Sequence, residues 1–398
     1  MGNVPAISAF EKRLKRHVVG RVREWFAVTA PGLEKWCQKE LTDPPVSITE
    51  VRPKVGGVMF KGRLDDCFRA NYHLRTANRI LMRLDRFKAT GFARFEKKAG
   101  QIPWEIYLPP GSRTMIHVKS RHCRLHHSQA LKERIERAIR QRIAEHTPEK
   151  SAINTSGHPQ GLFIRGIDDR FTISLDSSGE HLHRRSLKTQ RAVAPLRETL
   201  AAAILKIADY RPGEPLIDPM CGTGTFSIEA AMVSLKIPAG KFRRFAFEAW
   251  PAFRPARWKY IRSEGKKAEI VPTKPFVFAS DRGQAACRRL SRILTRVGLS
   301  QAIHIAHMDF FDEKHLERAT PPGLVVLNPP YGRRLGTPRQ SGQTIIRICR
   351  HLSTAYHGWR YALLIPKTGI DHPMIRSSRI TEISHGGLNL CLLTGRIP

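Results

Sequence analysis

Hydrophobic and polar positions follow two different patterns along the chain. Up to about residue 175, short alternating runs predict strands mixed with a few helices, ending in a hairpin across Asp168-Asp169. From residue 195 onwards, short apolar runs alternate with helical patterns, which is typical of βα units and a parallel sheet. The pattern therefore predicts an α+β half followed by an α/β half.

Most elements of the first half can be placed from these runs. Strands are predicted at residues 24–29, 46–51, 55–60, 80–84 and 115–120, and a helix at residues 64–74. A long amphipathic helix with a basic outer face follows, and its inward positions are Leu131, Ile135, Ala138, Ile139 and Ile143. Residues 1–21 are polar and basic without an apolar period, so we expect a loose arm there. Residues 176–194 predict a polar connection between the halves.

The segment LIDPMCGTGTFSIEAA, residues 216–231, predicts a strand, a glycine-containing loop and a helix. Gly222 and Gly224 allow positive φ and let the backbone lie against a ligand, so the loop is a candidate cofactor cradle. A Walker A loop is excluded because Gly224 is not followed by Lys and Ser or Thr, and a dinucleotide fingerprint is excluded because residue 227 is Ser. A cofactor without a phosphate group suits this loop better.

A second segment, LVVLNPPYGRRLG at residues 324–336, predicts a strand that delivers Asn328-Pro329-Pro330-Tyr331 at its carboxyl end. Ligands of open α/β sheets bind at this end of the strands. Each proline forces the residue before it into an extended conformation, so a side-chain amide oxygen and a main-chain carbonyl are held in place. Two acceptors beside an aromatic ring fit a planar base that carries an amino group.

Two further clusters are open to more than one interpretation. The insertion at residues 235–270 interleaves aromatic residues with cations, which either stack bases and hold phosphates or bury a small core of their own. His122, Cys123, His126 and His127 have metal-ligand chemistry, but no second ligand cluster accompanies them. We therefore expect no metal and interpret this stretch as a basic loop.

Composition narrows the class of partner. Lys and Arg number 68 against 34 acidic residues, giving a formal charge of +34, and this indicates a polyanion. No apolar stretch approaches the roughly 20 residues of a membrane-spanning helix. The seven cysteines are scattered without a C-x-x-C pair, and no secretory signal is evident, so a cytoplasmic protein is expected.

With both motifs in view, the chain resembles the S-adenosylmethionine-dependent methyltransferases whose fourth motif is N-P-P-Y. Within them it is similar to the RNA guanine-N2 methyltransferases of the RlmL type, a likeness also carried by the opening WFAVTAPGLEKWCQKEL. The resemblance implies a Rossmann-like class I methyltransferase domain, mostly parallel with an antiparallel last strand at the sheet edge, after an α+β THUMP RNA-binding module. The implied divisions are an arm at 1–21, a ferredoxin-like segment at 22–65, the THUMP domain at 66–175, a linker at 176–194 and the catalytic domain at 195–398.

The resemblance also implies site residues. Binding of S-adenosylmethionine would involve Pro195, Asp218, Pro219, Cys221, Gly222, Gly224, Thr225, Asp281, Asp309 and Phe310. The catalytic group would be Asn328, Pro329, Pro330 and Tyr331. Asp281 would accept hydrogen bonds from the ribose, although Gly283 stands where the family often carries a second acid.

The expected activity is methylation of the exocyclic N2 of a guanine, with 23S ribosomal RNA as the preferred partner. Three alternatives stay open at this point. They are guanine-N2 methylation of transfer RNA, adenine-N6 methylation of a nucleic acid, and a non-catalytic RNA-binding assembly factor.

Overall fold

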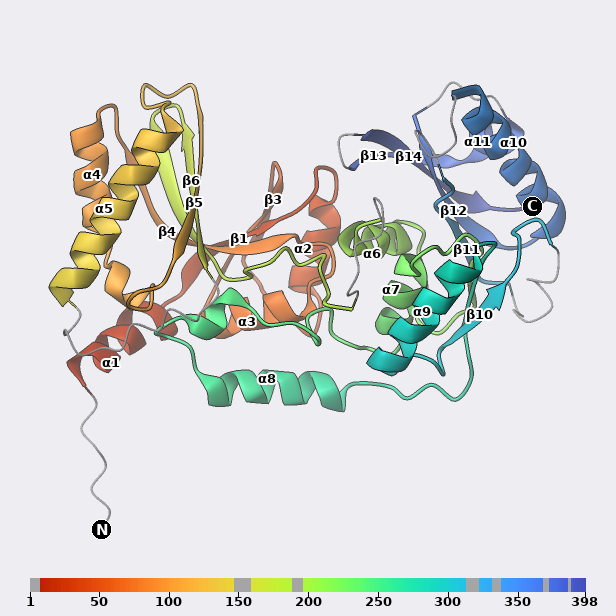
Figure 1. Ribbon diagram of the computed structural model, residues 1–398, viewed down its shortest axis with the longest axis horizontal. Coiled ribbons are helices and arrows are strands. Elements are labelled where there is room, and N and C mark those ends of the chain that lie inside the picture. Colours follow the sequence, from red (N-terminus) through yellow and green to blue (C-terminus); the bar gives the residue numbers. More distant parts are fainter. Residues whose placement is uncertain are drawn as a thin grey trace, which may run out of the picture. The chain divides into compact units, whose positions relative to one another are not determined.

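The computed structural model describes residues 8–146, 159–187, 196–312, 322–330, 338–367, 372–385 and 388–398 (Figure 1). The chain forms two compact units, each assembled from three segments. Unit 1 consists of Met1–Thr29, Cys37–Leu182 and Arg243–Arg262, and unit 2 of Ala30–Trp36, His183–Phe242 and Ser263–Pro398. The division is therefore interleaved along the chain, whereas the sequence predicts contiguous domains.

Unit 1 contains one seven-stranded sheet in the order β2-β3-β1-β4-β7-β6-β5. Its strands are β1 Arg23–Val28, β2 Val51–Lys54, β3 Gly57–Gly62, β4 Arg79–Lys88, β5 Thr114–Arg121, β6 Gln160–Ile167 and β7 Arg170–Asp176. Only β5 and β6 pair in parallel. The β6–β7 hairpin turns at Asp168 and Asp169, as predicted. The β2–β3 turn lies at Val55-Gly56, inside the strand predicted at residues 55–60, because Gly56 takes the positive φ that the turn needs.

The core of unit 1 lies against one face of this sheet. It combines strand residues such as Ile116, Ile164 and Phe171 with helical residues such as Leu131 and Ile135. The helices are α1 Ala9–Leu14, α3 Leu64–His73, α4 Phe92–Gly100 and α5 Ser128–His146, with short turns η1 Lys15–Val19 and η2 Trp104–Ile106; α2 Glu34–Thr42 begins in unit 2 and ends in unit 1. Figure 1 shows α4 and α5 side by side.

The predicted loose arm is wrong for the described residues 8–21. They form α1 and η1, and Leu14 and Val18 are buried in the core. These two residues are four positions apart, so they lie on one helical face. Lys15, Arg16 and His17 between them hide this short apolar period in the sequence.

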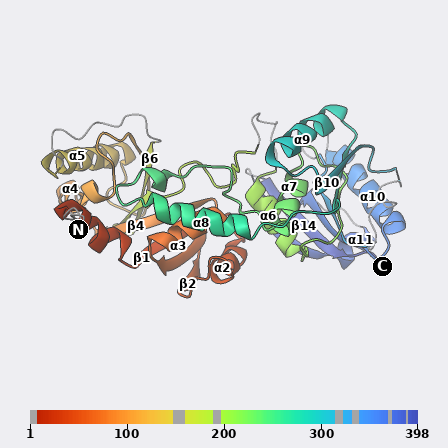
Figure 2. The same cartoon turned by 90° about the horizontal axis from the view of Figure 1, so that it is seen from below.

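The aromatic insertion supplies core to unit 1, which decides between the two interpretations. Phe245, Phe247, Trp250 and Trp258 are all buried, and the Phe247 ring stacks on Phe68 with centroids 4.3 Å apart. The elements here are η3 Ala246–Ala249 and α8 Pro255–Lys267, and α8 runs beside α3 (Figure 2). These rings are therefore not free to stack on bases.

The predicted linker is folded over its described residues, 176–187. Asp176 is buried and pairs with Arg79, while Ser177 and Ser178 exchange hydrogen bonds with the buried side chain of Asn71. The polar side chains of residues 176–178 are thus satisfied inside the protein, whereas Glu180, His181 and Arg184 are exposed. Residues 188–194 lie outside the described residues.

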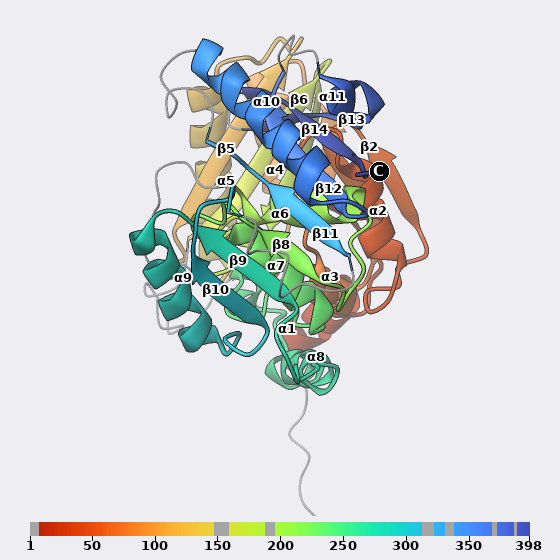
Figure 3. The ribbon, with the colours of Figure 1, turned by 90° about the vertical axis from the view of Figure 1, so that its right-hand side faces the viewer.

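Unit 2 is a second seven-stranded sheet in the order β10-β9-β8-β11-β12-β14-β13 (Figure 3). The strands are β8 Leu216–Asp218, β9 Val277–Asp281, β10 Ile303–His307, β11 Leu324–Leu327, β12 Arg360–Pro366, β13 Arg379–His385 and β14 Leu388–Arg396. The first five in this order are parallel, and β14 is antiparallel to both of its neighbours. The antiparallel strand expected at the edge is thus internal, because the unpredicted strand β13 pairs with its free side.

Helices cover both faces of the unit 2 sheet. One core cluster joins residues of α6 Glu198–Ile207, α7 Thr225–Ser234 and α9 Gln284–Val297 with Leu216 and Val326. The other joins residues of α10 Pro338–Ala355 and α11 Pro373–Ser377 with Ile217 and Val325. Consecutive strand residues point to opposite faces, so these strands are buried on both sides.

Candidate active site

Strand β8 lies between β9 and β11, and all three run in the same direction. Ile217 of β8 is opposite Val325 of β11, and Asp218 is opposite Ala279 of β9. Asp281 is the last residue of β9, and the glycine loop and Asn328 follow β8 and β11, so all three lie at the carboxyl ends of these strands. This is the end of the strands where open α/β sheets bind ligands.

The two glycines of the loop have different surroundings. Both have positive φ, +54° at Gly222 and +70° at Gly224. A Cβ on Gly224 would lie 2.3 Å from Cδ1 of Leu290, so the loop is packed tightly against α9. A Cβ on Gly222 would meet nothing within 4 Å. Gly224 thus serves the fold, while Gly222 leaves open space beside the backbone for a ligand.

Asp218 holds the start of helix α7. Its buried Oδ2 accepts hydrogen bonds from the Ser227 backbone N–H at 3.2 Å and from the Ser227 hydroxyl at 2.6 Å. The carboxylate therefore stabilises the loop from behind. Sequence reasoning missed Ser227. It is the third residue of α7, and the backbone N–H groups in the first turn of a helix have no partner within the helix.

Asp281 connects β9 to the glycine loop. One carboxylate oxygen accepts the Gly222 N–H at 2.9 Å, and the other accepts the Gly283 N–H at 2.8 Å. The loop is held again where the Cys221 N–H donates to the Ser280 carbonyl. Each carboxylate oxygen can accept a further hydrogen bond, and Asp281 is partly exposed, so the side chain fits ribose hydroxyls.

After strand β10, the side chain of Phe310 is not placed for the cofactor contact that the sequence predicts. The Phe310 ring is 2% exposed and packs against His351 and Tyr356 in the core, so it is not available to an adenine. Asp309 is partly exposed, and its Oδ1 accepts the Phe311 N–H at 3.0 Å. Any contact from residue 310 to a cofactor has to come from the main chain.

Pro219, Cys221 and Thr225 have buried side chains in the loop. Burial raises the pKa of the Cys221 thiol well above its ordinary value, and the carboxylates of Asp218 and Asp281 raise it further. The thiol is therefore protonated at neutral pH, and it is not a nucleophile.

Asn328 carries a buried hydrogen-bond acceptor at the carboxyl ends of the strands. Its Oδ1 is buried and has no hydrogen-bond partner among the described residues, and Pro329 beside it is buried. A buried acceptor without a donor costs about 1–3 kcal/mol, so this oxygen is placed for an incoming N–H. Tyr331 and Pro195 lie outside the described residues.

A buried ion pair behind the glycine loop was also missed by sequence reasoning. Arg185 Nε donates to Glu229 Oε1 at 3.0 Å, and both side chains are almost fully buried. Glu229 stands in the middle of the apolar helix α7, and a charge in such a position needs a partner. A glutamate inside an apolar helical pattern was therefore the sign in the sequence that a buried cation lies beside it.

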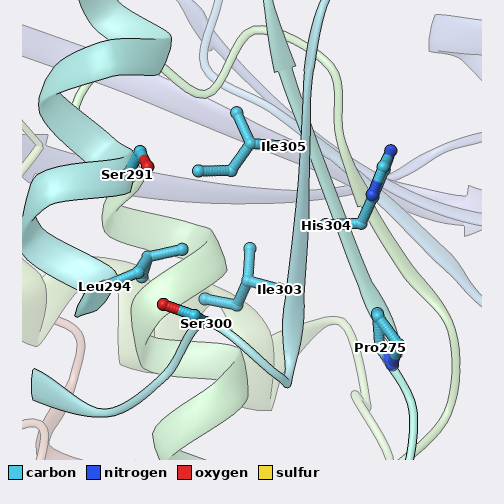
Figure 4. Close-up of a pocket in the computed structure, with 7 residues that line it drawn as sticks. All are labelled: Pro275, Ser291, Leu294, Ser300, Ile303, His304 and Ile305. Atoms are coloured by element: carbon cyan, nitrogen blue, oxygen red, sulfur yellow. The ribbon is translucent and has the colours of Figure 1, made fainter.

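A shallow hollow between α9 and β10 is separate from these loops. Ile303, Ile305 and Leu294 converge there, while His304 points to the other side of the strand (Figure 4). Pro275 and Ser300 precede β9 and β10, so the hollow lies near the amino ends of the strands. It is not part of the candidate site.

Comparison with known proteins identifies the family. Residues 185–382 match the RMKL-like methyltransferase domain, and residues 24–81 match the RlmL ferredoxin-like domain. The putative RNA methyltransferase YpsC of Bacillus subtilis is 32% identical over 311 residues, which is 77% of this chain and 79% of that protein. The chain belongs to the RMKL-like methyltransferases. This RMKL-like chain is also 29% identical to a putative RNA methyltransferase of Synechocystis, over 93% of this chain and 96% of the relative.

Ribosomal RNA large subunit methyltransferase K/L of Methylococcus capsulatus is 32% identical over 92% of the RMKL-like chain. The chain spans about half the length of that relative. Among solved structures, SMU.472, a putative methyltransferase complexed with SAH, has a TM-score of 0.83 and 25% identity, covering 95% of this chain and 99% of that one. SAH is what S-adenosylmethionine becomes when it loses its methyl group.

The residues present fit that cofactor. Gly222 leaves room beside the backbone, Asp281 offers acceptors to hydroxyl groups, and no phosphate-binding pattern is found in the loop. Within the described residues, no cluster of three or more potential metal ligands is found. Helices there are also too short or too polar to span a membrane.

Proposed function

We propose that this methyltransferase methylates the exocyclic N2 of a guanine in RNA, with large-subunit ribosomal RNA as its substrate. The observation that carries the proposal is the buried, unpartnered Oδ1 of Asn328 at the edge that also holds the glycine loop. The names of the K/L relatives support ribosomal RNA, and the charge of +34 supports a polyanionic substrate.

The chemistry of the target explains why two acceptors are needed. The N2 amine of guanine is a poor nucleophile, because its lone pair is delocalised into the ring. Acceptors at Asn328 Oδ1 and the Pro329 carbonyl each take one amine N–H, which draws the nitrogen towards tetrahedral geometry and aims its lone pair. When bound, S-adenosylmethionine supplies an electrophilic methyl group on sulfur. Rate enhancement then comes from positioning and electrostatics, without a strong general base.

The proline residues keep this arrangement stiff. Pro329 and Pro330 restrict the residues before them to extended backbone, so the amide of Asn328 and the carbonyl of Pro329 keep their relative direction. A guanine inside a folded RNA has to be unpaired or splayed out to reach them. In the proposal, Tyr331 stacks on that base.

Adenine-N6 methylation is the second candidate, because the same pair of acceptors serves any exocyclic amine. One structure with a TM-score of 0.83 is described as a predicted N6-adenine-specific DNA methylase from Listeria monocytogenes. Relatives named for ribosomal RNA support RNA over DNA as the substrate, and mass spectrometry of the product decides between the two bases.

The test is to incubate the full chain with methyl-labelled S-adenosylmethionine and total RNA from a strain that lacks this protein. Nucleosides are then separated by mass spectrometry, and the label is mapped. We expect N2-methylguanosine in large-subunit RNA. Labelled N6-methyladenosine would replace the proposal with the second candidate, and RNA binding without transfer would favour a non-catalytic assembly factor.

A further inference from the structure

We propose that the exposed β5–β6 part of the unit 1 sheet, on the face opposite the core, is a stacking platform for single-stranded RNA. The proposal rests on the proposed RNA substrate and adds how the RNA is held away from the chemistry. Its occupant is an unpaired RNA segment, whose bases stack on aromatic rings and whose phosphates meet cations.

The register of the strands defines this face. His117 of β5 is opposite Phe163 of β6, Phe163 is opposite Ser174 of β7, and Ser174 is opposite Arg83 of β4. Paired residues point to the same side of a sheet, so these four side chains share one face. Their strand neighbours, among them Ile116, Leu162, Ile164, Ile173 and Leu175, point to the core on the other face.

Aromatic groups on this face already form a stack. The rings of His117 and Phe163 lie 4.7 Å apart at an interplanar angle of 20°, and the Arg79 guanidinium lies 5.3 Å from the Phe163 ring centre. His117 is exposed, so its ring is the accessible end of this column. Partial burial lowers the pKa of His117, and Arg79, Lys132 and Lys119 lower it further. The imidazole is therefore neutral at pH 7 and stacks as an uncharged ring.

Cations surround the stack on the same face. Lys119 of β5 and Arg165 of β6 are exposed, and neither forms an ion pair within the described residues. The guanidinium of Arg83 lies 4.5 Å from the ring centre of Phe26 and donates to the Ser174 hydroxyl at 2.8 Å. Phe26 and Ser174 are buried, so Arg83 closes this side of the platform and the accessible part of the face lies on β5 and β6.

Helix α5 is a weaker candidate for the same role, although its outer face is basic in the sequence. Arg134 and Arg137 both pair with Glu96, and Arg142 pairs with Glu105. Their charge is thus partly neutralised. Lys119 and Arg165 keep theirs, and they lie beside aromatic rings, which is the combination that binds unpaired nucleotides.

A single strand fits this face better than a duplex does. Bases of a single strand can turn towards the His117 ring while the backbone follows Lys119 and Arg165 along neighbouring strands. In a duplex the bases are stacked on one another, so only the charges would contribute. The two contributions can therefore be separated by experiment.

The experiment measures binding of the full chain to a fluorescent 12-nucleotide RNA and to the same sequence as a duplex, over a range of salt concentrations. The stacking variant is His117→Ala with Phe163→Leu, which keeps an apolar side chain at residue 163. We expect its affinity for the single strand to fall about tenfold, with an unchanged salt slope and little effect on the duplex. The charge variant, Lys119→Gln with Arg165→Gln, should lower the salt slope by about 1.4.

The matched control is Arg140→Gln, which removes an exposed charge from α5. Single-strand affinity within twofold of the unaltered chain in the stacking variant, or an effect of Arg140→Gln as large as that of the charge variant, would overturn the platform. Circular dichroism checks that each variant is folded, and a Phe163→Tyr variant, which keeps an aromatic ring, should bind normally.

The outcomes separate this inference from the proposed function. Formation of N2-methylguanosine together with binding that ignores His117 and Phe163 would leave the function standing and remove the platform. Binding that depends on both residues, without any N2-methylguanosine, would do the reverse.

Discussion

Two glycines that look equivalent in the sequence do different work in the cofactor loop. Both need positive φ, yet only Gly224 is packed against a side chain, that of Leu290. The space beside Gly222 is open. The difference separates a residue that is needed to fold from one that is needed to bind.

This difference can be measured with alanine substitutions. In Gly222→Ala we expect weaker binding of S-adenosylhomocysteine in calorimetric titration, and a loss of about 1–2 kcal/mol in unfolding free energy from the left-handed backbone. In Gly224→Ala the added clash with Leu290 should make the loss in unfolding free energy larger. Gly213→Ala is the control, because Gly213 has φ +88° and open surroundings away from the loop. Equal cofactor binding in Gly222→Ala and Gly213→Ala would contradict the assignment.

Asn328 should show opposite effects on activity and stability. In Asn328→Ala we expect methyl transfer to fall by orders of magnitude while the dissociation constant for the cofactor stays the same. Unfolding free energy should stay equal or rise by about 1 kcal/mol, because the change removes a buried acceptor that has no partner in the described structure. Single-turnover transfer assays and urea unfolding test both parts. Near-normal transfer would reject the role of Asn328.

At this scale the sequence predicts positions better than contacts. Local patterns place Gly222 and Asn328 after strands and Asp281 at the end of one, and the structure confirms that placement. The burial of the Phe310 ring depends on packing against His351 and Tyr356 from distant parts of the chain, so no local pattern reveals it. The roles of the site residues in binding and catalysis stay predictions.

At the scale of elements, two side chains from outside helix α7 fix its amino-terminal half. Asp218 accepts the hydrogen bond of the Ser227 hydroxyl, and Arg185 forms the buried ion pair with Glu229, two residues further along the helix. Because the pair is desolvated, removing one partner leaves an uncompensated buried charge. The position of the cofactor loop therefore depends on a residue from the segment expected to be a linker.

Breaking this pair should be costly. Arg185→Met or Glu229→Leu alone should lower the unfolding free energy by about 3–5 kcal/mol, and the double variant should recover most of it. Urea denaturation of the full chain measures each value. Glu382→Gln is the control, since it breaks the exposed pair with Lys367 and should cost less than about 1 kcal/mol. A double variant as unstable as the single ones would show that the loss in unfolding free energy does not come from the broken ion pair.

Strand periodicity allowed most elements to be predicted, with errors where pairing decides the outcome. Strand β13 was missed, and β14 was assigned to the edge, because sequence does not show which neighbour covers a strand. Likewise, the aromatic residues of the insertion were recognised as either a core or a surface. Their burial against Phe68 decided the question, and that contact joins residues far apart in the chain.

On the scale of the whole molecule, acid sensitivity combines opposing groups within unit 1. Burial lowers the pKa of His73 to about 4, with Arg75 and Arg69 lowering it further. Burial raises the pKa of Asp176 to about 6, although Arg79 acts against the shift. Between these values, the unfolded chain binds more protons at His73, and the folded chain binds more at Asp176. Stability from His73 therefore falls as pH falls from about 6.5 towards 4, while Asp176 works in the opposite direction.

Removing His73 should leave the opposite pH dependence of Asp176 without its counterpart. In His73→Gln we expect the loss of unfolding free energy between pH 7.5 and pH 5.0 to shrink by about 2 kcal/mol compared with the unaltered chain. Urea unfolding curves at the two pH values, followed by circular dichroism, give the difference. An unchanged pH dependence would mean that His73 is accessible to protons in the folded state.

The interleaved course of the chain sets an order for protein synthesis. Unit 1 takes the last of its buried rings, including Trp258, from Arg243–Arg262, and a ribosome makes those residues only after the cofactor loop. The first sheet must therefore wait, with part of its apolar face uncovered, while His183–Phe242 of unit 2 emerges. Chaperone demand should peak in that interval and end once Arg262 has left the exit tunnel.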